Sequence, residues 1–382
     1  MRFLTAGESH GPKLLGIIEG LPAGLKISKN IIDEALGRRQ KGPGRGGRMQ
    51  IESDQVNFLS GLRGSLTTGA PLALEILNRD WANWEKVMAW DEEADLESRK
   101  VLTPRPGHAD LVGNLKYRTE VRNILERASA RETAMRVAIG SVAMQLLNCL
   151  GVEVKGQVTA VGGIKALTRE NQDYWQRVRN SEWAVADSQA EQKMWQRLAE
   201  AKEKGESLGG VIQIQVHNVP AGLGSHVQWD RKLDGKLAQA VLSVQAMKGV
   251  SFGIGFEAAD RLGSEVHDPI QYSRGKGYSH TSNNAGGIEG GMSNGEPIVL
   301  QAVMKPIPTL YSPLATVHLE TKEIVQASVE RSDICAVPAA RVVLEHVVAW
   351  VIAAEILTKF PADTYVELQK AWQEYRDYLQ TQ

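Results

Sequence analysis

One short segment occurs twice in the chain, and its setting constrains the fold more than any other feature of the sequence. The tetrapeptide PAGL begins at Pro22 and again at Pro220, and each copy follows a strand-like apolar run and precedes a helix-like pattern. The later stretches SARETAMRVAIGSVA and VPAARVVLEHVVAWVIAA also resemble each other. A repeated strand-and-helix unit predicts a duplicated framework with a pseudo-twofold axis. Chance similarity within an alanine-rich chain is the alternative.

Apolar patterns predict strands and helices in both halves. Strand-like runs are LLGIIEG and PLALEIL early in the chain, and GGVIQIQVHNV and PIVLQAVMK later. Helices are expected over 28–40 and 233–244, where apolar side chains fall on one stripe. A third helix is expected to open with a capping box at Ser129 and Glu132 and to run to Cys149.

A fourth helix is expected from Pro338, at a first helical position, to about Lys359. This helix and the one that ends at Cys149 carry few charges, so both are expected to be buried on most faces. The polar segment from about 168 to 206 is expected to form a peripheral insertion in a single domain over 1–382. It carries tryptophans at helix-like spacing, namely Trp175, Trp183 and Trp195.

The charge balance and the cysteine content exclude several classes of protein. The 382 residues carry 44 Lys+Arg against 45 Asp+Glu, whereas a general nucleic-acid binder normally has a basic excess. No apolar run reaches the length of a membrane span. The only cysteines, Cys149 and Cys335, exclude a disulfide framework and a thiolate zinc cluster. With no transit peptide ahead of the first strand, we expect a bacterial-type cytoplasmic protein.

Glycines and cations coincide in one early loop. The segment RRQKGPGRGGRM contains a cluster of cations, with no carboxylate before Glu52. Cations held this close repel one another unless an anion neutralises them, and guanidinium groups pair well with phosphate or carboxylate. The loop therefore indicates a polyanionic ligand, with a solvated basic loop as the alternative. Its cations are Arg38, Arg39, Lys41, Arg45 and Arg48.

Two histidines lie on turns that could supply acid–base groups near neutral pH. His108 follows two prolines in TPRPGHADL, which stiffen the turn, and His10 lies in GESHG. Arg127, Ser129 and Arg131 occur at a helix start, where backbone amides bind anions. A lone histidine is more often structural, so it is the pair that indicates catalysis.

Asp333 lies between Arg331 and an apolar segment, and its spacing fits either a pair with Arg331 or an orienting bond to a histidine. The chain contains no dinucleotide fingerprint, no P-loop and no metal-binding constellation. The residues alone thus indicate an enzyme that binds phosphorylated small molecules, and they leave its reaction type open.

Taken together, these segments resemble the chorismate synthase family over nearly the whole chain outside 168–206. The resemblance implies an α/β fold of the α+β type, a β-α-β sandwich with helices packed between antiparallel sheets, usually as a homotetramer. The matching segments are GESHGPKLLGIIEGLPAGL, RRQKGPGRGGRM, ESDQVNFLSGLRGSLTTGAPL, RPGHADL, SARETAMRVA, QAMKGVSFGIGF, NNAGGIEGGMSNGEPI, KPIPT and VERSDICAVPAA.

The resemblance also implies a reaction. Members of the family convert 5-enolpyruvylshikimate 3-phosphate to chorismate by anti-1,4-elimination of phosphate and a ring proton. This is the last common step of aromatic amino-acid biosynthesis, in the shikimate pathway. The family requires reduced FMN as a transient electron donor that also takes up the proton, although the reaction has no net redox change.

The resemblance assigns roles by position. His10 would protonate the departing phosphate, with Ser9 and Asp333 as relay partners, and His108 would protonate the anionic reduced flavin. Substrate anions would be bound by Arg39, Arg45, Arg48 and Arg131, of which Arg39 and Arg45 are also assigned to NADP. FMN contacts would be Arg127, Ala128, Ser129, Gln245, Ala246, Gly290, Lys305, Pro306, Ile307, Pro308, Thr309 and Arg331. Many relatives have a serine at position 128, so Ala128 lacks that hydroxyl contact.

Two other classes of protein share part of this pattern. An NADPH-dependent flavin reductase would need the flavin and anion sites, but neither paired histidines nor so many arginines. A non-enzymatic sensor of phosphorylated metabolites would leave both histidines idle. Because the chain shows no extra domain for reducing flavin with NADPH, we expect an external flavin reductant, and neither a nucleic-acid nor a membrane partner.

Overall fold

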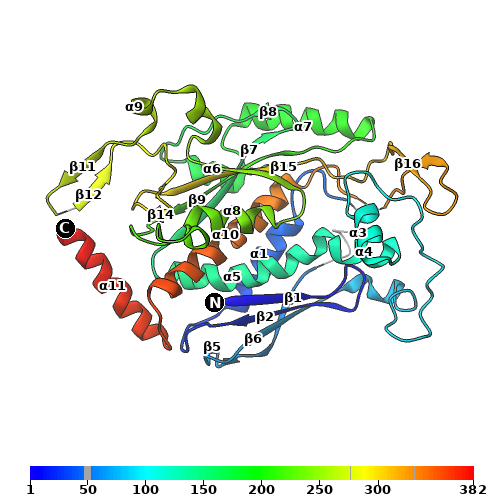
Figure 1. Cartoon of the computed structure of the whole chain (residues 1–382), viewed down its shortest axis with the longest axis horizontal. Helices are drawn as coiled ribbons and strands as arrows, with labels where there is room; N and C mark the ends of the chain where they lie inside the picture. Colours follow the sequence, from blue (N-terminus) through cyan, green and yellow to red (C-terminus); the bar gives the residue numbers. More distant parts are fainter. Residues whose placement is uncertain (47–52, 276, 331) are drawn as a thin grey trace.

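The computed structural model describes residues 1–46, 53–275, 277–330 and 332–382, and every structural statement below concerns these residues. Two antiparallel sheets enclose a layer of long helices, and a further helix lies outside the second sheet (Figure 1). The predicted sandwich, with helices between antiparallel sheets, is therefore confirmed. None of the described helices is long and apolar enough to cross a membrane.

The two sheets contain the strands predicted from the apolar runs. The first sheet has the order β1-β2-β6-β3, with bounds Arg2–Ala6, Lys13–Glu19, Leu72–Leu77 and Val56–Ser60. The second has the order β10-β15-β9-β7-β8, with bounds Met247–Phe252, Ile298–Met304, Gly210–His217, Glu153–Val161 and Ile164–Lys165. In β2 every second side chain is buried, which is the pattern of a strand with one face on the core.

The two halves of the chain repeat one topology, as the PAGL segments predict. In each half, two strands precede a helix, and two more strands precede a longer helix. The strand order β1-β2-β6-β3 of the first sheet is matched by β7-β9-β15-β10 of the second. Even the irregular last pair is repeated, because β3 and β10 each carry a register shift against their neighbour. The helices are α1 (Lys29–Gln40) and α5 (Thr133–Cys149), then α8 (Leu233–Leu242) and α10 (Val337–Lys359).

The two PAGL segments form the same hydrogen-bonded loop. The hydroxyl of Thr67 accepts from the amide of Leu25 (2.9 Å) and donates to the carbonyl of Pro22 (2.6 Å). In the second half, the hydroxyl of Ser293 makes the same two bonds, at 2.8 and 2.7 Å, with the last and first residues of PAGL. Because these contacts are equivalent in detail, the repeat is structural and not a chance similarity of composition.

The predicted burial of the two weakly charged helices is confirmed, since α5 and α10 pack against each other in the middle layer (Figure 1). Their contact is close because Gly140 of α5 faces the backbone of His346 in α10. A Cβ atom at Gly140 would lie 2.4 Å from the carbonyl oxygen of His346. Small side chains at this crossing therefore let the two backbones approach.

The start of α5 differs from the predicted capping box. A 3₁₀ turn over Ala130–Glu132 precedes the helix, and the Ser129 hydroxyl accepts from the amide of Arg131 at 3.2 Å. The tight turn brings this amide to the serine in place of the amide of Glu132. The carboxylate of Glu132 instead accepts from the hydroxyl of Thr5 (3.0 Å) and from Arg136 (3.1 Å).

The segment from 168 to 206 forms helices α6 (Tyr174–Asn180) and α7 (Ser188–Glu203), and α7 lies outside the second sheet in Figure 1. Its side chains extend the main hydrophobic core, because Trp183 is fully buried and packs edge-on against Trp195. Trp183 lies between the helices, so the helix-like spacing of the three tryptophans does not reflect one helix.

The remaining elements are short connections, apart from the C-terminal helix. The shorter helices are α3 (Asp110–Tyr117), α4 (Val121–Ala128) and α9 (Gly263–Val266), and the chain ends in the longer helix α11 (Tyr365–Thr381). Short paired strands are β4 (Leu62–Arg63), β5 (Leu66–Thr67), β11 (Ile270–Ser273), β12 (Gly277–His280), β13 (Ile288–Glu289), β14 (Met292–Ser293), β16 (Ala315–Val317) and β17 (Ile324–Gln326). Of these, α3 and α4 position the site.

Candidate active site

A cavity of about 680 Å³ lies between the two halves of the chain, at the N-terminal ends of the central helices α5 and α10. Most of the predicted site residues line it, from both halves. They are Ser9, His10, Arg39, Arg45, His108, Ala128, Ser129, Arg131, Gln245, Ala246, Lys305, Ile307, Pro308, Thr309 and Asp333. Both helix N-termini add positive potential to the cavity, which favours anions there.

Three predicted residues do not line the cavity. Arg127 instead bonds the carbonyl oxygens of Gly7 and Thr5, and so ties α4 to the first strand. Gly290 lies in the turn between β13 and β14, where a positive φ of 59° suits a glycine. Pro306 packs against Gly209, where an added Cβ would lie 2.9 Å from the proline nitrogen. The predicted Arg48 and Arg331 lie outside the described residues.

Two buried arginines share one carboxylate on the floor of the cavity. Arg131 donates to Asp54 at 2.7 Å, and Arg39 approaches the same carboxylate at 3.5 Å. Arg39 also donates to the Thr133 hydroxyl (2.9 Å) and to the carbonyl of Ala130 (3.0 Å). Burial lowers the pKa of Arg39 to about 9, because Asp54 offsets the loss of hydration only in part. Arg39 stays charged at neutral pH, so a bound anion would stabilise this cluster.

Asp333 is held by the basic loop and not by a histidine. Its carboxylate accepts from Arg45 at 2.5 Å and from the amide of Gly46 at 2.6 Å. Both of its oxygens therefore hold the glycine-rich loop against the segment before α10. The Ser9 hydroxyl, in turn, accepts from the hydroxyl of Ser129 at 3.1 Å. The structure thus does not support the predicted relay from Asp333 to His10.

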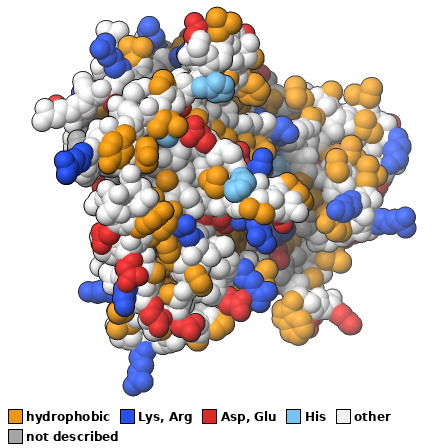
Figure 2. Space-filling view, turned by 60° about the vertical axis from the view of Figure 1, so that its left-hand side comes forward, with side chains coloured by type: hydrophobic (Ala, Val, Ile, Leu, Met, Phe, Trp, Pro, Cys, Tyr) orange, Lys and Arg blue, Asp and Glu red, His pale blue; other side chains and the backbone are white. Residues whose placement is uncertain are grey.

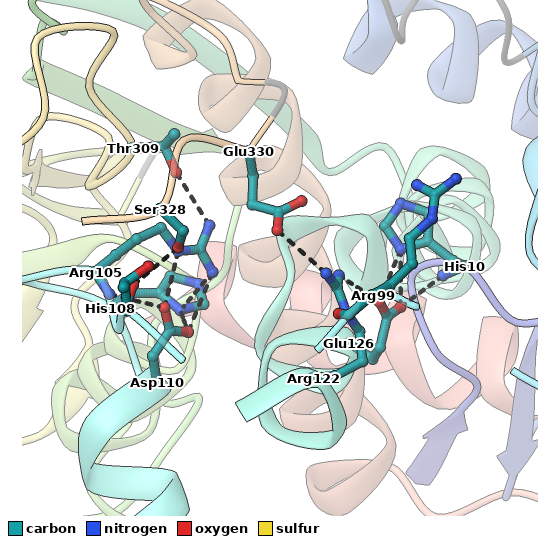
Figure 3. Close-up of polar contacts among 11 residues, drawn as sticks. His10, Arg99, Arg105, His108, Asp110, Arg122, Glu126, Thr309, Ser328 and Glu330 are labelled. Carbon is teal, nitrogen blue, oxygen red and sulfur yellow. Dashed lines mark hydrogen bonds and ion pairs between the residues drawn. The ribbon is translucent and has the colours of Figure 1, made fainter. Parts of the chain in front are cut away.

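A different carboxylate contacts the first histidine. The Nδ1 atom of His10 lies 2.8 Å from Oε1 of Glu126, and the His10 amide donates to Oε2 of the same residue at 2.8 Å (Figure 3). The imidazole also stacks on the indole of Trp84, with 3.8 Å between ring centroids. Glu126 is not among the residues predicted from the sequence, since it is 116 residues from His10. The available signal is that Glu126 shares the inner stripe of α4 with Arg122 and Leu125.

Burial alone would raise the pKa of Glu126, but the hydrogen bonds from His10 and the nearby Arg122 charge outweigh it. The net effect is a pKa below the ordinary value for glutamate, so this buried carboxylate is ionised at neutral pH.

The second histidine, His108, is also bonded to a carboxylate. The Nδ1 atom of His108 lies 2.5 Å from Oδ1 of Asp110, the first residue of α3 (Figure 3). Arg105 donates to Asp110 through Nε at 2.9 Å and to the Thr309 hydroxyl at 3.0 Å. Burial alone would raise the pKa of Asp110, but His108 and Arg105 hold it well below the usual range.

One part of the cavity wall suits a flat, mostly apolar ligand group. Segments that follow α8 and β15 form it, and the amide of Lys305 donates to the carbonyl of Ala246 at 3.0 Å. The side-chain oxygen of Gln245 is buried and has no hydrogen-bond partner among the described residues. A buried acceptor on this wall needs a donor, which a bound ligand can supply. Ile307 and Pro308 add apolar surface beside it.

The face of the molecule shown in Figure 2 does not share the basic character of the cavity. On the face shown in Figure 2, positive and negative side chains are interspersed. The formal net charge of the chain is −1. Among the described residues, no group of three or more histidine, cysteine, aspartate or glutamate side chains is arranged to hold a metal ion.

A basic cavity with two carboxylate-backed histidines defines an enzyme that performs acid–base chemistry on an anionic small molecule. Comparison with known proteins specifies the family. The family model described as "Chorismate synthase" matches residues 1–357. The chain belongs to the chorismate synthase family, and is accordingly a lyase that eliminates phosphate.

Individual relatives agree over almost their whole length. The chorismate synthase of Desulfitobacterium hafniense (strain Y51) is 70% identical over 379 residues, which cover 99% of each chain. That of Enterococcus faecalis (strain ATCC 700802 / V583) is 54% identical, with 100% of each chain covered. A solved structure titled "Crystal Structure of Chorismate Synthase" superposes with a TM-score of 0.81 at 41% identity, covering 100% of this chain and 98% of that one.

Proposed function

We propose that this chain converts 5-enolpyruvylshikimate 3-phosphate to chorismate by anti-1,4-elimination, with reduced FMN bound in the same cavity. One observation carries the proposal. A single cavity of about 680 Å³ contains both the buried arginines and two histidines that are each bonded to a carboxylate. A substrate with a phosphate and two carboxylates is a polyanion, and the buried arginines suit it.

The arginines bind and orient the substrate. Arg39 and Arg131 share a single carboxylate, so two buried cations are neutralised by one anion. Arg45 is held at the rim by Asp333. We assign these three, together with Arg48, to the phosphate and the carboxylates of the substrate. Fixed cations of this kind also stabilise the charge that collects on the phosphate as the C–O bond breaks.

His10 is the acid that protonates the departing phosphate. Its Nδ1 atom is bonded to Glu126, so we assign the proton transfer to Nε2. The stacked Trp84 covers one side of the ring and limits its movement. Protonation of the leaving oxygen lowers the barrier to C–O cleavage, because the group departs as a less highly charged phosphate.

The apolar wall fits a flavin. Gln245 offers a buried acceptor without a protein partner, and Ile307 and Pro308 offer flat apolar contact. Ala128 and Ser129 present the end of α4, and the segment from Lys305 to Thr309 completes the wall. When bound, reduced FMN supplies transient electron donation to the substrate and takes up the ring proton. His108, fixed by Asp110, would act as the proton donor to that group through Nε2, since Nδ1 is engaged.

The proposal extends to the pathway, the compartment, the oligomeric state and the source of electrons. We propose that it works in the shikimate pathway in the cytoplasm, where two free cysteines are stable. We also propose a homotetramer that receives reduced flavin from an external reductant, with NADPH as the source of electrons. Arg39 is 4% exposed and bonded on several sides, so it is better placed for a buried substrate anion than for NADP.

An anaerobic assay tests the proposal. Purified protein is mixed with 5-enolpyruvylshikimate 3-phosphate and photoreduced FMN, while phosphate release and chorismate absorbance are followed together. We expect both products in equal amounts and none with oxidised FMN. Release of phosphate without chorismate, or equal activity with oxidised FMN, would contradict the proposed reaction. An aerobic run with NADPH and FMN alone then tests the need for an external reductant.

A further inference from the structure

Glu126 is bound twice by the same histidine, and this sets which nitrogen of that histidine can act. Oε2 of Glu126 accepts from the backbone amide of His10 at 2.8 Å. The Nδ1 atom of the ring lies 2.8 Å from Oε1 and 3.0 Å from Oε2. An ionised carboxylate only accepts hydrogen bonds, so Nδ1 must carry a hydrogen. In the neutral ring, Nε2 is then the bare nitrogen.

The carboxylate itself is fixed by charge and burial. Glu126 is 2% exposed, and Arg122, one turn earlier on α4, approaches Oε1 at 3.4 Å. Arg122 is held in turn by Glu330 at 3.3 Å and by the carbonyl of Arg99 at 2.9 Å (Figure 3). The carboxylate therefore has little freedom to leave the histidine.

Trp84 supports the ring from its face. The two ring planes are 19° apart, which is a stacked arrangement, and the indole nitrogen donates to Asp80 at 3.2 Å. The guanidinium of Arg99 lies 4.1 Å from the centroid of the same indole. A flip of the imidazole would keep this stack but break the Glu126 bond, so Trp84 sets the plane of the ring and Glu126 sets which nitrogen faces it.

We infer that Glu126 is the positioning residue of His10, and that it directs Nε2 toward the cavity as the atom that exchanges the proton. The catalytic part of this inference rests on the proposed function, whereas the tautomer of His10 does not depend on it. The second pair is similar in that Nδ1 of His108 lies 2.5 Å from Asp110, and it differs in that an Arg105 nitrogen lies 3.1 Å from the same atom. That pair provides an internal reference, since it does not share the Glu126 carboxylate.

The substitution Glu126→Gln gives a specific expectation. A glutamine has one acceptor oxygen, and the amide of His10 must donate to it. Nδ1 lies 3.0 Å from that Oε2 position, but its shorter contact, at 2.8 Å, is with the Oε1 position that the NH2 group then occupies. Two donors repel each other at that distance, so the neutral His10 ring should move its hydrogen to Nε2. As an acid at Nε2, His10 acts in its imidazolium form, whose charge the Glu126 carboxylate stabilises. Glu126→Gln removes this carboxylate, and we expect kcat to fall about 10²- to 10⁴-fold with little change in KM.

The tautomer is measured by ¹⁵N NMR of histidine-labelled protein without flavin or substrate, at a pH where the imidazoles are neutral. Wild-type protein should show His10 with a bonded hydrogen on Nδ1, and Glu126→Gln should show it on Nε2, while His108 stays unchanged. The matched control is Glu120→Gln, at the start of the same helix, which should alter neither the spectrum nor kcat. Glu126→Asp keeps the charge, so it should keep the wild-type tautomer and recover part of kcat.

Each outcome bears on the inference separately from the proposed function. If Glu126→Gln and Glu126→Asp both show the wild-type tautomer and the wild-type kcat, the positioning role is wrong. If the tautomer inverts but wild-type protein forms no chorismate, the proposed function fails and the geometry stands. Should Glu126→Gln not fold, the decision passes to Glu126→Asp, in which a changed His10 signal with unchanged kcat overturns the inference.

Discussion

At the scale of single residues, two buried arginines of the cavity share one carboxylate. Asp54 serves both Arg131 and Arg39 while it is 4% exposed. A buried carboxylate between two buried guanidinium groups stabilises the fold only as long as all three are present. The excess positive charge on this cluster is what prepares the cavity for a polyanion.

Replacing this shared carboxylate should therefore cost stability. In Asp54→Asn two buried cations lose their counter-charge, and we expect the free energy of unfolding to fall by about 3–5 kcal/mol. Chemical denaturation measures the change, with Asp91→Asn on an exposed loop as control. Inorganic phosphate should restore more stability to the variant than to the wild type. Equal stability of variant and wild type would show that the arginines are neutralised by other groups.

Most residues of the site can be predicted from the sequence, whereas the contacts between them cannot. The residue types of His10, His108, Arg39 and Arg131 indicated acid–base and anion chemistry, and all four line one cavity. The partner of His10 could not be found in this way, because Glu126 becomes its neighbour only through packing of α4 on the first strands. Asp333 was assigned to His10, yet it binds Arg45.

At the scale of elements, the contact between α5 and α10 holds the two halves together. Its closeness depends on Gly140, because a Cβ there would lie 2.4 Å from the carbonyl oxygen of His346. The helices themselves were predictable from their apolar composition and from Pro338. The 3₁₀ turn before α5 was not, because it depends on bonds of Glu132 to Thr5 and Arg136.

A pair of glycine substitutions tests this contact. Gly140→Ala must push α5 and α10 apart, and we expect a loss of about 1–3 kcal/mol in the free energy of unfolding. Gly37→Ala is the matched control, since a Cβ there meets nothing within 4 Å. Gly37 lies inside α1, so the control should gain about 0.5–1 kcal/mol. Urea unfolding measures both, and a neutral Gly140→Ala would show that the crossing can relax.

The buried His346, at the contact between α5 and α10, predicts that the free energy of unfolding depends on pH. Burial lowers the pKa of His346 from 6.5 to about 4. The folded state thus binds the proton less readily than the unfolded state. Stability is complete above pH 6.5, and about 3 kcal/mol is lost as the pH falls from there to about 4. Unfolding titrations should show a flatter pH profile for His346→Leu. An identical slope in wild type and variant would remove His346 as the cause.

On the scale of the whole molecule, the duplication explains where the cavity lies. The segments that precede α5 and α10 occupy equivalent places in the two halves, and both contribute to its wall. Neither half alone contains the histidines together with the apolar wall, because His10 and His108 come from the first half and the 305–309 segment from the second. The repeat was visible in sequence through PAGL, whereas the meeting of the two helix starts required the packed structure.

The central claim is that both histidines of this one cavity take part in the elimination. The most direct measurement is anaerobic turnover with reduced FMN by His10→Ala and His108→Ala, beside the exposed control His226→Ala. Equilibrium binding of 5-enolpyruvylshikimate 3-phosphate is measured on the same proteins. We expect kcat to fall about 10²- to 10⁴-fold in each cavity variant, with substrate binding retained and the control unchanged. Full turnover by either cavity variant would contradict the account.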